Sequence, residues 1–371
     1  MQSNSYQICS QCVMDTSDPD IIFNEYGVCN HCKNYEIKVL AQIIPDEKRS
    51  LSLKNLVTQI KEQGSRKKYD CIIGISGGVD SSYVVLLAKD LGLKALLVHL
   101  DNGWNSEIAV KNIKNVVENT GFDLFTYVID WDEFRDIQLS LFKASVVDIE
   151  LATDHAIKAV LFRLAAKFRV KYMLNGGNVI TEAIMPVSWR HTKVDKSNLL
   201  DIHKKFGTIR LKSYPKAGII KQQFYKILLG ITNVKILNYV DFDRDIVIKR
   251  LKSELEWQEY GGKHHESVFT RFYQAYILPK KFNIDKRRCH YSNLICAGQL
   301  TRNEAIGAIK EPVYNVKLLN TDLEYVLKKL QFSKAEFDQY IKSPKVSHYI
   351  YKSDEFLIKF LIKIRLKFLG Y

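Results

Sequence analysis

Short apolar runs alternate with helical segments between residues 70 and 175. Residues 70–75 form a mostly apolar run suited to a buried strand, and residues 81–91 carry apolar side chains at helical spacing. Further strands are expected at 93–100, 123–130 and 171–175. This alternation predicts an α/β fold with a parallel sheet. The sequence has no run of 18 or more apolar residues, so we expect no membrane-spanning helix.

Two pairs of cysteines precede this region in the pattern C-x2-C-x16-C-x2-C over residues 9–32. Two intervening residues let both thiolates of a turn reach one metal, and two such turns complete a tetrahedron. Thiolate ligands select zinc or an iron–sulfur cluster, and the symmetric spacing favours structural zinc. Bound zinc would stabilise a segment that is too small to fold on its own core. The expected zinc ligands are Cys9, Cys12, Cys29 and Cys32.

The turn SGGVDSS at residues 76–82 lies between the first strand and its helix. Glycines permit a tight turn, and the N–H groups at a helix start hold phosphate oxygens. The turn is neither a Walker A loop nor a GxGxxG fingerprint. It resembles the PP-loop of the ATP pyrophosphatase superfamily, whose parallel-sheet core is of the N-type, adenine nucleotide alpha hydrolase-like class. A capped glycine turn without a ligand is the alternative.

The resemblance to a PP-loop implies that the turn holds the β,γ-pyrophosphate of ATP while the α-phosphate goes to the substrate. Asp80 is then expected to act in catalysis and to bind Mg²⁺, with Glu182 as a second Mg²⁺ ligand or an ordinary surface carboxylate. The expected nucleotide-binding residues are Gly74, Ser76, Gly77, Gly78, Val79, Asp80, Ser81, Ser82, His99, Asp101 and Gly176.

Four parts are expected along the chain. A zinc-ribbon-like module with the four paired cysteines covers residues 1–45, and a linker helix covers 46–68. The PP-loop ATP-binding domain covers 69–235. A mainly helical region for substrate or partners covers 236–371.

A narrower resemblance comes from four further segments. Residues 153–156 (TDHA), 176–183 (GGNVITEA), 260–267 (YGGKHHES) and 270–305 are similar to the N-acetyl sugar amidotransferase family. That family acts in lipopolysaccharide O-antigen and related surface-sugar synthesis. The resemblance includes the cysteine pairs and extends to about residue 320.

This resemblance implies an ATP-dependent carbon–nitrogen ligase. The acetamido oxygen of a nucleotide-linked N-acetyl sugar would attack the α-phosphorus of ATP and release pyrophosphate. Ammonia would then displace AMP and leave an acetamidino sugar. Such chemistry depends on positioning and on cations near the phosphates, so Lys263 and Arg287 are the expected catalytic cations. The other expected substrate residues are Trp104, His155, Thr181, Glu182, His264, His265 and Arg271.

Several of these residues have an ordinary structural alternative. Trp104 would stack on a ligand ring or pack in the core. His264, His265 and His290 would carry protons, and the alternative for His264 and His265 is that they satisfy structural hydrogen bonds. His31, between the last two cysteines, would compete as a metal ligand or lie beside the site in solvent.

Motifs that this sequence lacks lead to expectations about the source of ammonia and the cellular location of the protein. It has no G-x-C-x-G elbow, and Gln2 follows the first methionine, so the resemblance implies a separate glutaminase and an ammonia-channel subunit. No secretory signal is visible, which predicts a cytoplasmic protein. The tail 356–371 predicts an apolar helix with a stripe of lysines. This helix would pack on the body or lie on the inner face of the membrane.

The net charge of +14 suits a polyanionic partner, but the basic residues are spread along the chain, so no nucleic acid is expected. Two alternatives remain open. One is a zinc-containing PP-loop tRNA thiolase with Cys289 or Cys296 at its site. The other is a non-catalytic zinc-ribbon protein that retains a nucleotide fold.

Overall fold

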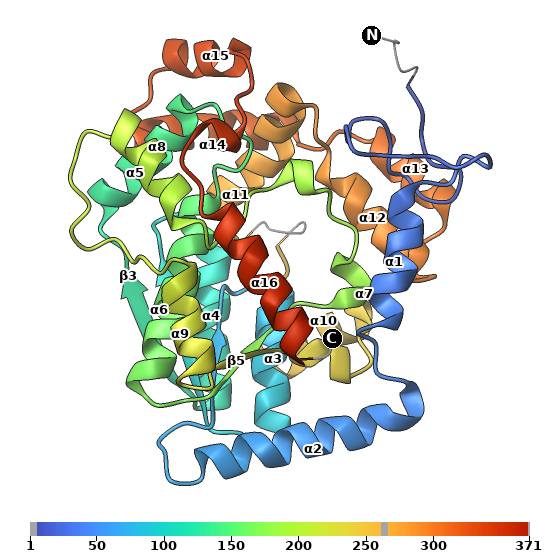
Figure 1. The fold of residues 1–371 in the computed structure, drawn as a ribbon, viewed down its shortest axis with the longest axis vertical. Helices are drawn as coiled ribbons and strands as arrows, with labels where there is room; N and C mark the ends of the chain where they lie inside the picture. Colours follow the sequence, from blue (N-terminus) through green and yellow to red (C-terminus); the bar gives the residue numbers. More distant parts are fainter. Residues whose placement is uncertain (1–5, 261–265, 370–371) are drawn as a thin grey trace.

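A five-stranded parallel sheet forms the centre of the molecule, in a computed structural model that describes residues 6–260 and 266–369 (Figure 1). The strand order is β3-β2-β1-β4-β5, and every neighbouring pair is parallel. The strands are β1 (Cys71–Gly74), β2 (Ala95–Asp101), β3 (Asp123–Val128), β4 (Tyr172–Asn175) and β5 (Thr232–Lys235). The first four match the predicted runs, and only β2 extends beyond its run, by one residue, to Asp101. The sequence TNVK of β5 is short and mostly exposed, so it carries no apolar run to predict it.

The two faces of the sheet pack against separate helical layers, because successive side chains of a strand point to opposite faces. Cys71 and Ile73 contribute to one core, whereas Ile72 contributes to the other. Both faces of β1 and β2 are buried, which explains their continuous apolar sequences. The first core is formed with α2 (Asp46–Gly64), α3 (Val79–Asp90), α4 (Glu107–Thr120) and α10 (Arg244–Leu255). The second is formed with α5 (Trp131–Lys143), α6 (Leu151–Lys167), α8 (Lys196–Phe206) and α9 (Ile219–Ile227).

Short segments connect these layers at the ends of the strands. They are α7 (Val179–Glu182), η1 (Val187–Trp189) and η2 (Ile236–Tyr239).

The remaining helices form the N-terminal module and the C-terminal region. The N-terminal module contains α1 (Asn30–Leu40), which contacts α7 and α12. The C-terminal region contains α11 (Val268–Phe272), the π-helix η3 (Tyr273–Phe282), α12 (Lys286–Cys296), α13 (Arg302–Lys310), α14 (Val316–Leu330), α15 (Lys334–Lys342), η4 (His348–Ile350) and α16 (Glu355–Leu369).

The C-terminal region joins the α/β core immediately beyond β2. The Ser106 N–H donates to the Glu266 carbonyl at 2.9 Å, and the Val268 N–H donates to the Trp104 carbonyl at 2.9 Å. Asn105 and Ser267 form an antiparallel bridge between these bonds. The start of α11 is therefore fixed at the carboxyl end of the sheet, where ligands bind in open α/β folds.

Helix α16 packs one side on the body and exposes another. Ile358 is 4% exposed, whereas Phe356 is 86% exposed and Phe360 is 52% exposed. Lys359 pairs with Glu355 at 2.9 Å. Among the described residues, no helix has both the length and the apolar character needed to cross a membrane. The contact of this helix with a membrane surface stays a prediction.

The fold class predicted from the sequence is confirmed. The structure has a parallel α/β core with the phosphate turn between its first strand and helix. It also has a four-cysteine cluster near the N-terminus and a helical C-terminal region.

Candidate active site and metal site

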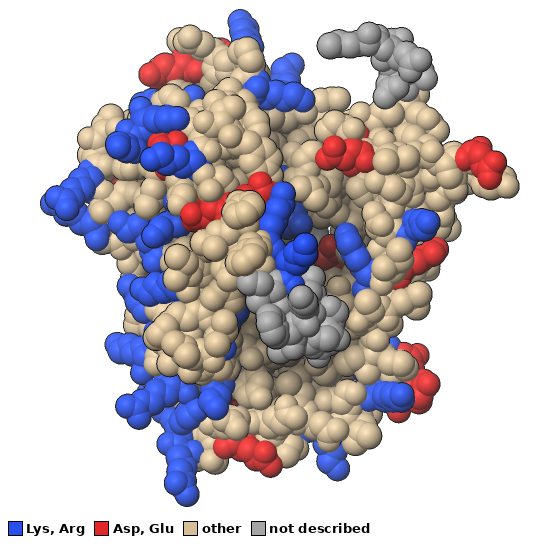
Figure 2. All heavy atoms as spheres, viewed as in Figure 1, with Lys and Arg blue, Asp and Glu red and all other residues tan. Residues whose placement is uncertain are grey.

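A cleft of about 1610 Å³ lies beyond the carboxyl ends of the strands. Its walls come from the strand ends, α6, α7, α11 and α12. Figure 2 shows the molecule hollowed near its centre, with lysine and arginine side chains around the hollow. The sequence-predicted residues that line the cleft are Gly74, Ser76, His99, Gly176, Thr181, Glu182, Arg271 and Arg287. One cavity therefore brings together residues that the sequence placed in distant segments.

The backbone of the phosphate turn requires glycine at position 77. Gly77 has φ +79, and a Cβ there would lie 2.5 Å from the Ala109 carbonyl oxygen on α4. The Gly77 carbonyl accepts from Trp257 Nε1 at 3.0 Å and from Asn112 Nδ2 at 3.3 Å. Two neighbouring segments thus hold the turn in a conformation that other residues rarely adopt.

The three serines of the turn have different surroundings. Ser76 is exposed, and its Oγ lies 3.2 Å from the Oγ of Ser81. The Gly78 N–H donates to Ser76 Oγ at 3.3 Å. Ser82 is 0% exposed, so its hydroxyl has no access to a ligand in the cleft. Phosphate binding by the hydroxyls of Ser76 and Ser81 stays a prediction; Ser76 lines the cleft, whereas Ser82 is buried.

Tyr260 contacts the start of α3, although the sequence did not single it out. Its hydroxyl accepts a hydrogen bond from the Val79 N–H at 3.1 Å. Burial raises the pKa of Tyr260, and the nearby charge of Glu266 raises it further. Val79 itself is 5% exposed, so its side chain packs in the core. The segment at 260–267, which contains Tyr260, is the sequence feature that could have indicated this contact.

Asp80 occupies the first turn of α3, where the helix dipole stabilises a carboxylate. A Cβ on Gly176 would lie 2.8 Å from the Cβ of Asp80, so only glycine lets the loop after β4 approach this closely. Glu182 ends α7 and lines the cleft. These positions leave Mg²⁺ binding by Asp80 and Glu182 a prediction.

His99 and Asp101 form a hydrogen-bonded group at the end of β2. His99 Nδ1 lies 3.0 Å from the Ile75 carbonyl oxygen, and its Nε2 lies 3.0 Å from Asn105 Nδ2. These partners assign the ring proton to Nδ1, because a carbonyl only accepts and an amide nitrogen only donates. Asp101 Oδ1 accepts from Gly103 N and Asn105 Nδ2. The group shapes the cleft floor, with His99 reaching the cavity lining.

Trp104 and His155 lie in the protein core. Trp104 is 1% exposed, and its Nε1 donates to Gln138 Oε1 at 2.9 Å. His155 is 0% exposed; its Nδ1 lies 2.9 Å from the Lys193 carbonyl oxygen, and its Nε2 accepts from the Ala217 N–H at 3.2 Å. Trp104 therefore packs in the core, the alternative considered for it, and His155 is buried as well; neither residue lines the cleft.

The two predicted arginines are bound to the protein itself. Arg271 forms a fork on Asp322, with N–O distances of 2.7 and 2.8 Å. Arg287 engages Asp285 and three carbonyls at the end of α13, so each of its five N–H groups faces an acceptor. The guanidinium of Arg287 therefore holds the end of α13 in place. This contact is structural, whereas the sequence predicted a catalytic role for Arg287. The other expected basic and imidazole residues, Lys263, His264 and His265, lie outside the described residues.

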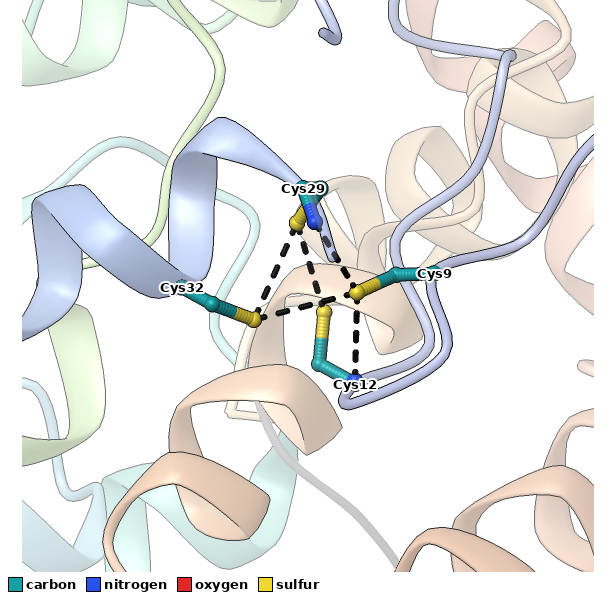
Figure 3. Close-up of side chains that lie close together, drawn as sticks. All are labelled: Cys9, Cys12, Cys29 and Cys32. Carbon is teal, nitrogen blue, oxygen red and sulfur yellow. Dashed lines mark hydrogen bonds between the residues drawn. The ribbon is translucent and has the colours of Figure 1, made fainter. Parts of the chain in front are cut away.

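The four expected zinc ligands converge at one point (Figure 3). Sulfur–sulfur distances are 3.8 Å for Cys9–Cys32, 3.7 Å for Cys12–Cys29 and 3.8 Å for Cys29–Cys32. A tetrahedral zinc with Zn–S bonds of about 2.3 Å places its sulfurs about 3.8 Å apart. The cysteines are at most 1% exposed. This donor set and spacing fit a closed structural zinc site.

His31 is not part of this cluster. Its Nε2 lies 2.7 Å from Asp18 Oδ2. Burial alone would raise the pKa of Asp18, but hydrogen bonds from His31 and Ser188 hold that pKa below its usual value. His31 therefore supports the loop around the metal site instead of competing as a ligand.

The cysteine module is fastened to the C-terminal region. Arg302 donates to the carbonyls of Cys9 and Cys12 at 2.8 to 3.1 Å. Arg288 pairs with Asp15 at 3.0 Å. On the other side of the module, Lys38 donates to the Ala183 carbonyl at 2.9 Å and lines the cleft. The metal site thus stabilises one wall of the cavity from outside it.

Zinc content tests the assignment of the four ligands. We expect about one zinc per chain in the purified protein, and loss of that zinc in Cys29→Ser, because three thiolates leave the tetrahedron incomplete. Elemental analysis measures the metal, and hydrogen exchange over residues 9–32 should quicken in the variant. Cys71→Ala, in β1 away from the cluster, is the control and should retain zinc. Iron with inorganic sulfide in the wild type would contradict the assignment.

His155 predicts a pH dependence of stability. Burial lowers the pKa of His155 to about 4, whereas an unfolded histidine has a pKa near about 6.5. Because the folded pKa is the lower one, the stabilisation is complete above pH ~6.5 and is lost as the pH falls towards about 4. The melting temperature should fall across this window, and His155→Gln should make the fall shallower.

His348 accounts for part of the same fall, because burial lowers its pKa to about 3. The control is His203→Gln, which removes a histidine that faces the Asp136 carboxylate at 2.7 Å. It should leave the steep fall in place. An unchanged slope in His155→Gln would show that the buried ring does not titrate as described.

Comparison with known proteins gives one family match. Residues 266–365 match the family "LPS biosynthesis protein WbpG-like, C-terminal domain". This match extends past residue 320, where the sequence offered no recognisable motif. No curated protein matches the chain.

Three solved structures show a likeness at a TM-score of 0.29. NMN synthetase from Francisella tularensis is 13% identical and covers 58% of this chain and 98% of its own. A predicted subunit of tRNA methyltransferase from Methanocaldococcus jannaschii is 16% identical; the match covers 56% of this chain and 86% of that protein's chain. NH3-dependent NAD synthetase from Campylobacter jejuni is 15% identical; the match covers 56% of this chain and 93% of that protein's chain. At that TM-score these likenesses support no inference for this chain. What the comparisons establish is that residues 266–365 are similar to the C-terminal domain of WbpG-like LPS biosynthesis proteins.

Proposed function

We propose that this protein is an ATP-dependent amidotransferase that acts on a nucleotide-linked N-acetyl sugar. It adenylylates the acetamido oxygen, and ammonia then replaces that oxygen to give an acetamidino sugar, AMP and pyrophosphate. An amide oxygen is a poor leaving group, so its conversion to a phosphate ester is what makes the displacement feasible.

The observation that carries this proposal is the single cleft shared by two segments. Ser76 of the phosphate turn lines it on one side. Thr270, Arg271 and Lys286, from the segment that resembles an LPS biosynthesis domain, line it on another. A nucleotide held by the turn and a sugar held by the C-terminal region would therefore meet in one cavity.

The chain's own groups suit the separation of charge in such a reaction. The N–H groups of the first turn of α3 beyond Val79, whose own N–H donates to Tyr260, and the hydroxyls of Ser76 and Ser81 would hold the outer phosphates as they leave. Asp80 and Glu182 would bind Mg²⁺, which neutralises charge on the phosphates when it is bound. The acetamido oxygen forms a bond to the α-phosphorus as the α–β bridging bond breaks. Nitrogen later bonds to the imidate carbon as AMP departs with that oxygen.

The proposal also includes the source of ammonia, the role of the zinc site and the location of the protein in the cell. Ammonia would come from a separate glutaminase through a channel-forming partner. The zinc site has no open position and would act only in structure. The protein would work in the cytoplasm, with α16 contacting the inner face of the membrane.

A PP-loop tRNA thiolase is the second candidate, and Cys289 favours it. Cys289 lines the cleft, which is where a thiolase would need a sulfur nucleophile. Its Sγ donates to the Lys286 carbonyl at 3.0 Å within α12. The two functions differ in their demand on this thiol, because amidation needs no cysteine in the cleft.

The test is mass spectrometry of nucleotide acetamido sugars after incubation with ATP, Mg²⁺ and ammonium. We expect a product lighter by the difference between an oxygen and an NH group. Asp80→Ala should reduce its formation by at least about 100-fold, since it removes a group that neutralises charge in the transition state.

Two variants provide controls. Asp90→Ala, at the far end of the same helix, removes an exposed carboxylate that pairs with Arg250 at 3.0 Å, and it should leave activity unchanged. Cys289→Ser should also keep the activity. If no acetamido nucleotide sugar yields the lighter product, or if Asp80→Ala forms it at the wild-type rate, the proposed function is wrong.

A further inference from the structure

Four basic side chains from separate elements gather on the wall of the cleft formed by α6 and α9. They are Lys158 of α6, Arg190 after η1, Lys193 before α8 and Lys226 of α9, and all four line the cavity. We call them the cationic cluster. No sequence motif predicted it, because each residue comes from a different segment.

The members of the cluster are neutralised unequally. Lys193 pairs with Asp148 at 2.7 Å and with Asp154 at 2.9 Å. Lys158, by contrast, has no hydrogen bond or ion pair with the described part of the chain. The negative charge that acts on Lys158 is that of Asp154, which also pairs with Lys193. Three carboxylates, Asp148, Asp154 and Glu150, act on the cluster through Lys193, so its four cations still outnumber them.

The pKa of Lys158 reflects the charges around it. Burial lowers the pKa of its ammonium, Asp154 partly restores it, and Lys193, Lys226 and Arg190 lower it further. Like charges held close together in a recess favour a bound anion, because an anion between them removes their repulsion. At least one of these charges has a fixed position, because Lys193 donates a hydrogen bond to Asp148, which is 2% exposed.

The same wall offers apolar and amide groups beside the cations. Phe162 lines the cleft and stacks on Tyr225, with ring centroids 5.7 Å apart. The Lys226 ammonium lies 5.9 Å from the centre of the Phe162 ring. Gln222 also lines the cavity. A ligand that combines phosphate with a nucleoside or sugar fits such a mixed surface.

We propose that the cationic cluster binds the diphosphate of the nucleotide-linked substrate. The cleft would then contain two phosphate sites, the turn at 76–82 for ATP and the cluster for the second substrate. Two polyphosphates in one cavity repel each other, so each requires its own cations. The identity of this ligand rests on the proposed function, whereas the anion site itself does not.

A nucleic acid is a poorer match to this wall. The cluster lies inside a cleft, whereas proteins that bind RNA spread their phosphate contacts along an extended surface. Only a few cations gather here, which suits one diphosphate group.

Calorimetry tests the cluster separately from catalysis. The probes are UDP and CDP, titrated into the full chain in the presence of Mg²⁺ and saturating α,β-methylene-ATP, which occupies the phosphate turn and resists cleavage. We expect at least one probe to bind the wild type. Lys158→Gln and Arg190→Gln should each weaken that binding by about 10- to 100-fold, the usual effect of losing a charge-assisted hydrogen bond.

The control is Lys204→Gln, which removes an exposed lysine of α8 that does not line the cleft. It should leave probe binding unchanged, and no variant should alter the affinity for α,β-methylene-ATP. Melting temperatures equal to the wild type show that Lys158→Gln and Arg190→Gln are folded.

The outcomes separate this proposal from the proposed function. Probe binding that depends on Lys158, without any amidated product, would support the anion site and contradict only the reaction. An amidated product with probe binding unaffected by both substitutions would contradict the site and leave the reaction standing. Failure of both probes to bind, or tRNA binding that depends on Lys158 and excludes UDP, would overturn the proposal.

Discussion

The close approach of three backbones at the carboxyl end of the sheet is the constraint on which the rest of the site depends. Gly77 adopts φ +79 against α4, and Gly176 lies against Asp80 without room for a Cβ. These two contacts set the position of the α3 N-terminus beside the loop after β4. The turn thus reaches the cleft at Ser76, and the start of α3 follows directly behind it.

The cavity over this helix start is completed by segments that come from both ends of the chain. The cysteine module is tied to α12 and α13 through Arg288 and Arg302, and its own Lys38 reaches the cleft. Residues 266–268 are fixed beyond β2 by backbone hydrogen bonds. The module and the C-terminal region therefore form one wall. The four-cysteine cluster therefore lies behind a wall of the cleft and outside the cavity itself.

Much of the fold and part of the site could be predicted from the sequence, for reasons that are local. The strands at 70–75 and 93–100 are buried on both faces, so their apolar runs are continuous. The cysteine spacing and the SGGVDS turn encode geometry within a few residues of chain.

The remainder depends on contacts between distant segments. The role of Arg287 is set by carbonyls of α13, and Tyr260 reaches Val79 only through the fold. The cationic cluster combines four elements, none of which carries a signal alone. Trp104 and His155 were proposed for the ligand, but burial in the core is a property of the packed molecule.

The central claim is that the turn at 76–82 holds the outer two phosphates of ATP while the inner one is transferred. The most direct measurement uses ATP labelled at the α-phosphate, incubated with an accepted acetamido nucleotide sugar, Mg²⁺ and ammonium. The account predicts that the label appears in AMP, in an amount equal to the sugar product. Label in ADP, with inorganic phosphate released, would contradict it.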